Sequence, residues 1–367
     1  MIGVSFKKDP VLWISGALAI LSSLVFPASS GILASIDFDT LILLFALMLS
    51  MEGLKRKNVF RLTGQTLLKR VRTQRGVVLT LTALCFFSSM FITNDVALIT
   101  FIPLGLLVFD LANLEKHLCF GVTVMTIAAN LGSMLTPVGN PQNLYLYALS
   151  GQSLPQFLLL MLPYSLLAAV MLGGCIFLMC KNAPVSFTLD SAENVSFRSI
   201  CPYLLLFLLA LLCVAGVFPK WILFPAALVL IFFADRSLFL KADYSLLATF
   251  VFFFVFIGNV KGLSELCRVI ESLLAGRECL AGVLLSQVIS NVPAAILLSG
   301  YTRQFSALIV GTNLGGLGTL IASMASLISY KLLAASHPEQ KGRYLGVFTA
   351  WNLAFLVVLC ALAWVLL

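Results

Sequence analysis

The chain has 367 residues, of which 60% are hydrophobic and only 10% are charged, and its formal net charge is +8. About a quarter of the residues of an average soluble protein are charged, so this composition excludes an ordinary soluble domain. Long apolar runs rich in Phe, Leu and Gly also argue against an outer-membrane barrel, whose strands would alternate polar and apolar residues. The expected fold is an all-α polytopic membrane protein with about ten crossing or half-crossing segments.

The basic residues gather in one connection between apolar segments, at Lys55–Lys57, Arg61 and Lys69–Arg72. The positive-inside rule makes this connection cytoplasmic. The first apolar run, 11–26, is interpreted as a membrane helix that follows a cytoplasmic N-terminus, rather than as a cleavable signal peptide. We therefore expect a multi-pass protein whose basic residues meet the lipid bilayer and not nucleic acid.

The apolar stretch 86–104 carries Thr93, Asn94 and Asp95 in a row near its middle. An aspartate at the centre of a membrane helix costs at least about 2.5–3.5 kcal/mol, so it normally faces protein or a water-filled cavity. We expect a helical hairpin over 76–109 that enters from the cytoplasm, turns at these three residues and returns. At such a tip Asp95 would hold Na⁺ or carry a proton.

The next segment, 118–150, reads as a broken helix because glycines and prolines interrupt it between Asn130 and Asn143. Asn140 is suited to cap a restarted helix, with Pro141 in its first turn. Broken helices offer carbonyl oxygens for a cation and a half-helix N-terminus for an anionic group. The first-half candidates are Asn94, Asp95, Asn130 and Gly132 for the coupling cation, and Thr93, Thr136, Gly139 and Asn140 for the substrate.

The second half repeats both motifs in the same order. Ser290-Asn291-Val292-Pro293 matches the first tip and lies in an expected hairpin, 279–304, while Thr312–Leu320 matches Ala129–Pro137 and opens an expected broken helix, 305–332. The connection before this copy, 261–278, mixes acidic and basic residues, which suggests that the second repeat is inverted in the membrane. The second-half candidates are Ser290, Asn291, Asn313 and Gly315 for the cation, and Pro293 and Thr319 for the substrate.

These elements divide the chain into a first repeat, 1–180, a cytoplasmic linker, 181–199, and a second inverted repeat, 200–367. The nine cysteines form no Cys-x-x-Cys pair and both histidines fall in expected loops, so neither a transition-metal site nor another cofactor is expected. The sequence does not decide whether Cys267 and Cys279 form a disulfide. An intramembrane aspartyl protease would need a second embedded aspartate, and apart from Asp95 the aspartates fall at expected helix ends or loops.

Four stretches carry a family resemblance: 89–104, 129–147, 286–300 and 311–332. Together they resemble the ion transporter superfamily, which includes arsenite permeases, D-type sodium/proton antiporters, and citrate and dicarboxylate/sodium symporters. The likeness extends to short bacterial inner-membrane permeases of the YbiR type. It implies a scaffold part and a transport part in each repeat, a homodimer held by the scaffold helices, and an elevator-like movement of the transport part.

In the dicarboxylate branch each tip carries Ser-Asn-Thr, whereas the tips here are Thr93-Asn94-Asp95 and Ser290-Asn291-Val292. This departure leaves the substrate open and favours proton coupling through Asp95 as much as Na⁺ coupling. The sequence thus predicts a secondary active transporter, not an enzyme, that moves a small anionic substrate by elevator-type alternating access. A Na⁺/H⁺ antiporter or an arsenite-type efflux permease is the alternative, with an intramembrane enzyme as the third.

Overall fold

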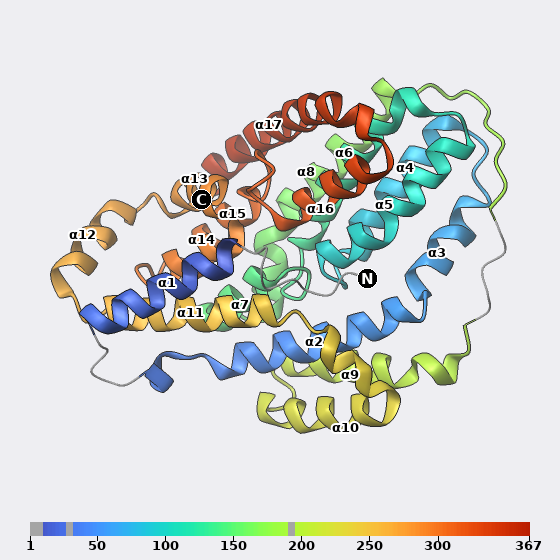
Figure 1. The fold of residues 1–367 in the computed structure, drawn as a ribbon. Coiled ribbons are helices and arrows are strands. Elements are labelled where there is room, and N and C mark those ends of the chain that lie inside the picture. The colour runs from blue at the N-terminus through green and yellow to red at the C-terminus, as the bar shows by residue number, and fades with distance from the viewer. Residues whose placement is uncertain (1–9, 27–31, 190–194) are drawn as a thin grey trace.

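The computed structural model describes residues 10–26, 32–189 and 195–367. The regular elements among these residues are all helices, joined by turns and loops (Figure 1). One isolated antiparallel bridge joins Thr73 to Pro184. The all-α prediction is therefore confirmed. The expected cytoplasmic N-terminus and the centre of the expected linker 181–199 lie outside the described residues.

The first half contains eight α-helices in the described residues, and a turn or a short loop separates most of them. They are α1 (Pro10–Val25), α2 (Phe38–Arg56), α3 (Val59–Leu68), α4 (Gln74–Ser88), α5 (Asn94–Leu111), α6 (Glu115–Ser133), α7 (Pro141–Ser150) and α8 (Leu154–Met179). The pair α4 and α5 is the expected first hairpin, and α6 and α7 are the two parts of the expected broken helix.

The second half contains nine α-helices in its described residues. They are α9 (Phe197–Val214), α10 (Leu223–Asp235), α11 (Tyr244–Val260), α12 (Ser264–Leu274), α13 (Glu278–Ile289), α14 (Asn291–Ser299), α15 (Phe305–Leu314), α16 (Met324–Ser336) and α17 (Lys341–Leu366). The 3₁₀ helices η2 (Ile32–Ser35), η3 (Lys220–Ile222), η4 (Arg236–Lys241) and η5 (Pro338–Gln340) join several of the α-helices. The pair α13 and α14 is the second hairpin, and α15 and α16 form the second broken helix.

Five helical stretches in the described part of the chain are long and apolar enough to cross a bilayer. They are Asn94–Leu111, Leu154–Met179, Phe197–Val214, Lys220–Lys241 and Pro338–Leu366. Six further apolar helices have 10–17 residues, which is shorter than the roughly 20 residues that a full crossing needs. Hairpins and broken helices of this length agree with the expected multi-pass protein that contains half-crossing segments.

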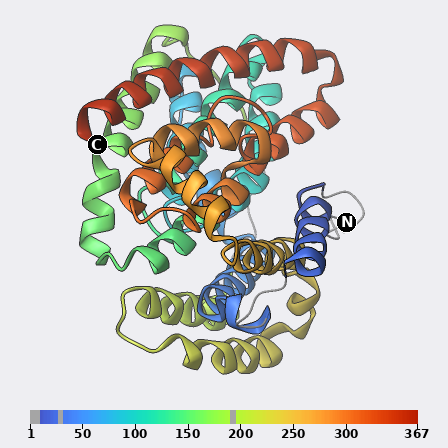
Figure 2. The ribbon, with the colours of Figure 1, turned by 90° about the vertical axis from the view of Figure 1, so that its left-hand side faces the viewer.

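Two groups of helices make up the molecule (Figure 2). In the first group α1 packs on α11, and α2 packs on α9 and α10. Close approach between α2 and α9 depends on Gly53, because a Cβ atom at that position would lie 2.3 Å from the ring of Tyr203. This group is called the scaffold group below, and it lies in the lower part of Figure 2.

The second group contains both hairpins and both broken helices and is called the hairpin group. In it α6 packs on α4 and α5, while α15 packs on α13 and α14. The halves also interlock, because α5 packs on α16 of the second half and α14 packs on α7 of the first. The two hairpins lie in opposite halves of the view, with α4 and α5 on the right and α13 and α14 on the left (Figure 1).

The same order of elements thus occurs twice, from α2 to α8 and again from α11 to α17. Each series begins with an aspartate N-cap: Asp37 accepts from the amide of Thr40, and Asp243 accepts from the amide of Leu246. Nine cysteines are free thiols, so the disulfide left open between Cys267 and Cys279 is not formed.

Candidate functional site

Each hairpin tip is hydrogen-bonded to the break in the broken helix of its own half. The backbone amide of Asn94, the first residue of α5, donates to the carbonyl oxygen of Gly139 at 3.2 Å. In the second half the amide of Asn291, the first residue of α14, donates to the carbonyl oxygen of Ala322 at 3.0 Å. Gly139 and Ala322 each precede the N-cap of the restarted helix, α7 or α16, so the two contacts are equivalent.

Asn130, near the end of α6, is bonded by residues of both halves. Its side-chain oxygen accepts from the amide nitrogen of Asn94 and from the hydroxyl of Ser323, each at 3.0 Å. Its own amide nitrogen donates to the hydroxyl of Ser326 at 3.4 Å. All four side chains are buried. Asn130 therefore connects the first tip to the second broken helix.

Asn313, near the end of α15, makes the equivalent contacts with the restarted helix of the first half, but no hydrogen bond within the described residues joins it to the second tip as Asn130 is joined to Asn94. Its side-chain oxygen accepts from the amide nitrogen of Asn140 at 3.2 Å, and its amide nitrogen donates to the side-chain oxygen of Asn143. Asn140 and Asn143 are the N-cap and third residue of α7, as Ser323 and Ser326 are of α16. In each half, the asparagine before the break is thus bonded to the N-cap and the third residue of the other half's restarted helix. Asn94, Asn130, Asn140, Asn143, Asn313, Ser323 and Ser326 are called the cross-repeat network below.

The two candidate glycines, Gly132 and Gly315, lie where a broken helix touches the arm of its hairpin. A Cβ atom on Gly132 would lie 2.1 Å from the carbonyl oxygen of Phe86 and 2.6 Å from the hydroxyl of Ser89. On Gly315 it would lie 2.6 Å from the hydroxyl of Ser286. Both glycines therefore permit close helix packing. Their place beside a bound cation stays a prediction.

The candidate threonines tie each break to its hairpin arm. The hydroxyl of Thr136 donates to the carbonyl oxygen of Met90. The hydroxyl of Thr319 donates to the carbonyl oxygen of Gln287 at 3.3 Å, and the amide of Thr319 donates to the side-chain oxygen of Gln287 at 2.9 Å. These equivalent contacts hold the loops in shape, and any contact of the threonines with substrate remains to be tested.

The carbonyl oxygens of the breaks, which the sequence offers as cation ligands, accept hydrogen bonds from side-chain amides. Asn143 donates to the carbonyl oxygens of Ser133, Met134 and Thr136 at 3.4, 3.2 and 3.2 Å. Gln287 donates to those of Gly315 and Leu317 at 3.0 and 2.9 Å. A cation would have to share these oxygens with the two amides or displace them.

Asp95 differs from the rest of the site in lacking a partner for one oxygen. Its Oδ1 is buried and makes no hydrogen bond within the described residues. Its backbone amide donates to the side-chain oxygen of Asn94 at 3.0 Å. A carboxylate oxygen buried without a partner is costly, and a proton or cation removes that cost. In the second tip Val292 occupies the equivalent place.

The two tips also differ in backbone conformation. Ser290 has a φ of 74° and a ψ of 155°, a region occupied almost only by glycine, whereas Thr93 has an ordinary extended conformation. The Ser290 hydroxyl donates weakly to the carbonyl oxygen of Ala322 at 3.4 Å. Pro293, expected to open the second half-helix, lies buried in the first turn of α14. Thr93 caps α5 without a side-chain cap bond.

Two crevices separate the scaffold group from the hairpin group. The large crevice, about 1280 Å³, is lined by Asp37 and Lys261 of the scaffold side and by Tyr145 and Ser299 of the hairpin group, whose hydroxyls lie 2.8 Å apart. The basic crevice, about 640 Å³, lies between the end of α2, the start of α3, η4 and one face of α5. They sit at opposite ends of α2 and α11.

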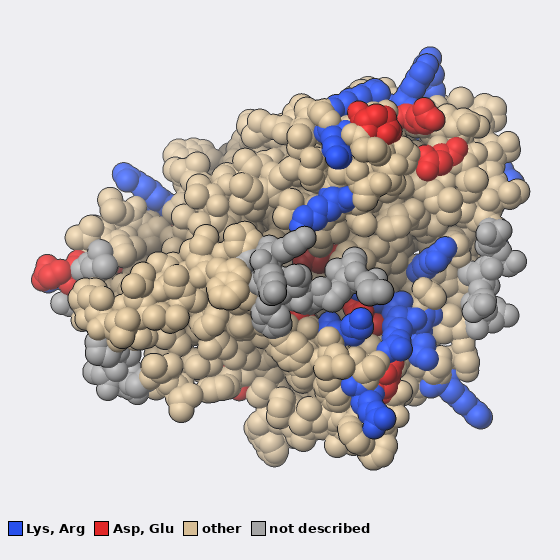
Figure 3. All heavy atoms as spheres, viewed as in Figure 1, with Lys and Arg blue, Asp and Glu red and all other residues tan. Residues whose placement is uncertain are grey.

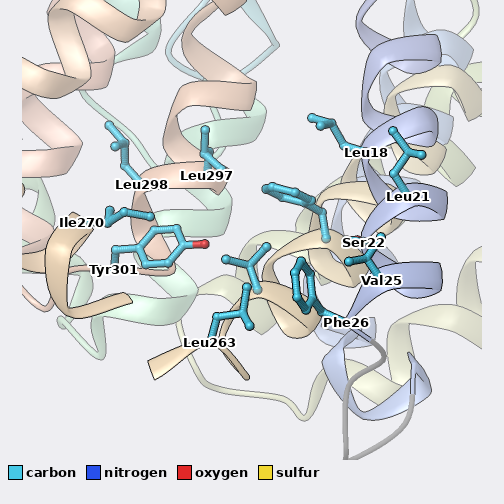
Figure 4. A pocket seen from close by; sticks show the side chains of 12 residues that line it. Leu18, Leu21, Ser22, Val25, Phe26, Leu263, Ile270, Leu297, Leu298 and Tyr301 are labelled. Carbon is cyan, nitrogen blue, oxygen red and sulfur yellow. The ribbon is translucent and has the colours of Figure 1, made fainter. Parts of the chain in front are cut away.

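A third cavity, about 530 Å³, is almost entirely apolar and lies between α1, α11, α12 and α14 (Figure 4). Ser22 and Tyr301 carry the side-chain oxygens in its lining. This composition suits hydrocarbon and not an ion or anionic solute. The described residues also contain no group of three or more His, Cys, Asp or Glu side chains that could hold a metal ion.

Four side chains of the site are not among the residues predicted from the sequence: Asn143, Gln287, Ser323 and Ser326. The internal repeat contains a usable signal for three of them. Once Asn140 is identified as an N-cap and aligned with Ser323, the residues three positions later, Asn143 and Ser326, follow from the period of a helix. Gln287 has Met90 as its counterpart, so the repeat contains no signal for it.

Comparisons with known proteins agree with this architecture. The citrate transporter family model matches residues 5–304. The uncharacterized transporter MJ0456 of Methanocaldococcus jannaschii is 32% identical over 95% of this chain and 96% of its own length. The inner membrane protein YbiR of Escherichia coli is 31% identical over 82% of this chain and 81% of its own.

A solved structure of similar fold is that of the YdaH transporter of Alcanivorax borkumensis, described as having an unusual topology. It superposes with a TM-score of 0.57 at 14% identity and covers 98% of this chain and 88% of its own. At that identity the likeness concerns the fold alone.

Proposed function

Because the chain belongs to the citrate transporter family of the ion transporter superfamily, we propose that it is a secondary active transporter that moves a small anionic solute with Na⁺ or H⁺. Its relative MJ0456 is named as a transporter and YbiR as an inner membrane protein, and this chain is a multi-pass membrane protein rather than an enzyme. The inner membrane is the location that fits the YbiR relative.

The observation that carries the proposal is the cross-repeat network. In many transporters built from inverted repeats, the substrate and coupling ions bind where discontinuous helices of the two repeats meet. Asn130 and Asn313 each bond to a restarted helix of the other half. The substrate would bind where the restarted helices begin, since the N-termini of α7 and α16 carry partial positive charge.

We assign ion coupling to Asp95. Its buried Oδ1 makes no hydrogen bond with any described residue, and the side-chain oxygen of the preceding Asn94, which accepts from the backbone amide of Asp95, would supply a second oxygen ligand. Na⁺ would bind to these oxygens, or a proton would bind to the carboxylate. Ser290 and Asn291 of the second tip would form part of a partner cation site, and Pro293 would lie beside the substrate on the opposite side.

Alternating access follows from the two crevices in this proposal. We assign residues 1–180 and 200–367 to inverted repeats, with the basic crevice on the cytoplasmic side by the positive-inside rule. The large and basic crevices would then open the site in turn as the hairpin group moves along the scaffold group. We also propose a homodimer through α9 and α10, whose exposed large apolar side chains include Phe224, Phe232 and Phe233.

The test is solute uptake into proteoliposomes that contain the purified protein, with labelled citrate first and then a panel of small anions. Uptake would be compared under an imposed Na⁺ gradient, a pH gradient and neither. Accumulation that needs one gradient and is lost in Asn130→Ala supports the proposal. If no anion accumulates under either gradient while the gradient itself collapses, the protein is an exchanger of cations.

That second function is favoured by one observation, the presence of Asp95 at only one tip. A single carboxylate suffices to exchange Na⁺ for H⁺ without a solute, or to drive proton-coupled efflux. Efflux would be seen as faster loss of a preloaded solute from the same proteoliposomes when the outside is made acidic.

A further inference from the structure

The basic crevice has features that the transport site does not explain. It is lined by the end of α2, the start of α3, η4 and a face of α5 formed by Ile99, Pro103 and Leu107. Its charged lining residues are Glu52, Lys55, Arg56, Arg61 and Lys241, so four are basic and one is acidic. Blue side chains gather in the lower right of Figure 3, around the region where α2 ends and α3 begins.

Two of the four basic side chains are already neutralised. The ammonium of Lys55 lies 2.7 Å from a carboxylate oxygen of Glu52, and the guanidinium of Arg56 lies 2.6 Å from one of Asp235. Arg61 and Lys241 form no ion pair with any described residue, and both are exposed. The crevice therefore presents two cations without an ion-pair partner among the described residues, one from α3 and one from η4.

The start of α3 adds polar donors to this site. Asn58 lines the crevice at the N-cap of α3, with a left-handed backbone, and makes no side-chain cap bond. Amide groups in the first turn of a helix favour an anion. The start of α3 thus adds to the attraction for an anion that Arg61 and Lys241 provide.

The crevice also leads toward the transport site. Asp95, Ile99, Pro103 and Leu107 follow one another at intervals of four, so they share one face of α5. Asp95 lies at the tip end of that face, about 6 Å along the helix from Ile99. A solute in the crevice would thus be close to the route that reaches the first tip.

We propose that the basic crevice is an oxyanion-binding site, in which Arg61 and Lys241 hold a carboxylate or phosphate group between the scaffold group and the hairpin group. A guanidinium can bind two oxygens of such a group at once, and an ammonium adds a point charge. The role of this site as a waiting position for the anionic solute rests on the proposed function. The binding itself does not.

The test is the dependence of thermal stability on inorganic phosphate, at constant ionic strength and in a neutral detergent. Phosphate should stabilise the wild-type protein, because a ligand that binds only the folded state raises its melting temperature. In Arg61→Gln/Lys241→Gln the phosphate concentration for half the effect should rise at least about tenfold. The control is Lys69→Gln/Arg70→Gln, which removes the same charge from exposed positions outside the crevice.

A phosphate effect that is missing in the wild-type protein, or equal in the two double variants, would overturn the proposal. Lipid nanodiscs identify the source of the oxyanion. If phosphatidylglycerol nanodiscs abolish the phosphate effect that phosphatidylcholine nanodiscs retain, the lipid headgroup occupies the site. If both retain it, a free anion does.

The core variant Asn130→Ala separates this inference from the proposed function. It should keep the phosphate effect and lose solute uptake. If uptake in the wild-type protein is shown but the crevice variants bind phosphate normally, the inference fails and the transporter stands. If phosphate binds at the crevice but no gradient drives any solute, the binding site stands and the proposed function fails.

Discussion

At the first hairpin tip the side chain of Asn94 donates to Asn130, and the next residue is Asp95. At the second tip Asn291 makes the equivalent backbone bond to the break, but Val292 follows it. Both tips therefore make the same backbone bond to the break of their own half, while only the first tip carries a charged side chain. The comparison teaches that equivalent backbone contacts recur in the two halves, whereas the carboxylate to which we assign ion coupling stands at the first tip and has a valine as its counterpart at the second.

The largest difference in stability should come from the glycines at the two breaks. Gly132→Ala should lower the free energy of unfolding by about 3 kcal/mol, because its Cβ atom would meet the backbone oxygen of Phe86, which cannot turn away. Gly315→Ala should cost about half as much, since its nearest contacts are with the side chain of Ser286, at 2.6 and 2.7 Å, and the nearest backbone oxygen, that of Gly282, lies farther away at 2.9 Å. Thermal unfolding in detergent measures both.

A matched pair of second substitutions checks the reason given. Ser286→Ala removes the nearest atom and should restore a small part of the loss in Gly315→Ala, where the Cβ atom of residue 286 and the backbone oxygen of Gly282 remain at 2.7 and 2.9 Å. Ser89→Ala should restore less in Gly132→Ala, where the nearest atom, at 2.1 Å, is a backbone oxygen. Equal losses and equal rescue in the two halves would show that the packing of the breaks is symmetrical after all.

Substitutions of the two tip asparagines should differ less in their effect on the free energy of unfolding. Asn94→Ala removes a buried hydrogen bond to Asn130 and should cost about 1–2 kcal/mol. Asn291→Ala removes one long contact, 3.5 Å from the hydroxyl of Ser290, and should cost under about 1 kcal/mol. Unfolding by a chemical denaturant gives both values. A larger cost at Asn291 would mean that the second tip is the more firmly bonded.

The smallest expected effect comes from backbone strain. Ser290→Gly relieves a conformation that costs on the order of 1–3 kcal/mol in other residues, so stability should stay level or rise by about 1 kcal/mol. Thr93→Gly offers no relief and should lower stability by about 1 kcal/mol. If both glycines lower the melting temperature alike, the strain at Ser290 has no energetic weight.

The sequence predicted the hairpins and broken helices because Asn, Gly and Pro in an apolar run each impose a local constraint on the backbone. It predicted equivalent residues in both halves for the same reason. It could not predict that Asn140 meets Asn313 or that Ser323 meets Asn130, since these contacts depend on how two half-helices from distant segments meet. Gln287 lies on a hairpin arm, where a glutamine is an ordinary helical residue. Only its hydrogen bonds to the break identify it as part of the site.

The function of Thr136 and Thr319 illustrates the same limit. Polar residues in a break favour a substrate site when only the sequence is considered. In the structure their hydroxyls bond to Met90 and Gln287 of the hairpin arms, so each has a structural task that a motif does not reveal.

The most direct test of the account is the effect of Na⁺ and pH on the thermal stability of Asp95→Asn, beside wild-type protein and the second-tip control Val292→Asn. The account predicts that Na⁺ or a lower pH stabilises the wild-type protein and Val292→Asn, because a cation or proton satisfies the buried oxygen of Asp95. Asp95→Asn should fold and show neither effect. If Asp95→Asn responds to Na⁺ and pH as the wild-type protein does, the coupling site lies elsewhere and the contrast between the two tips has no functional meaning.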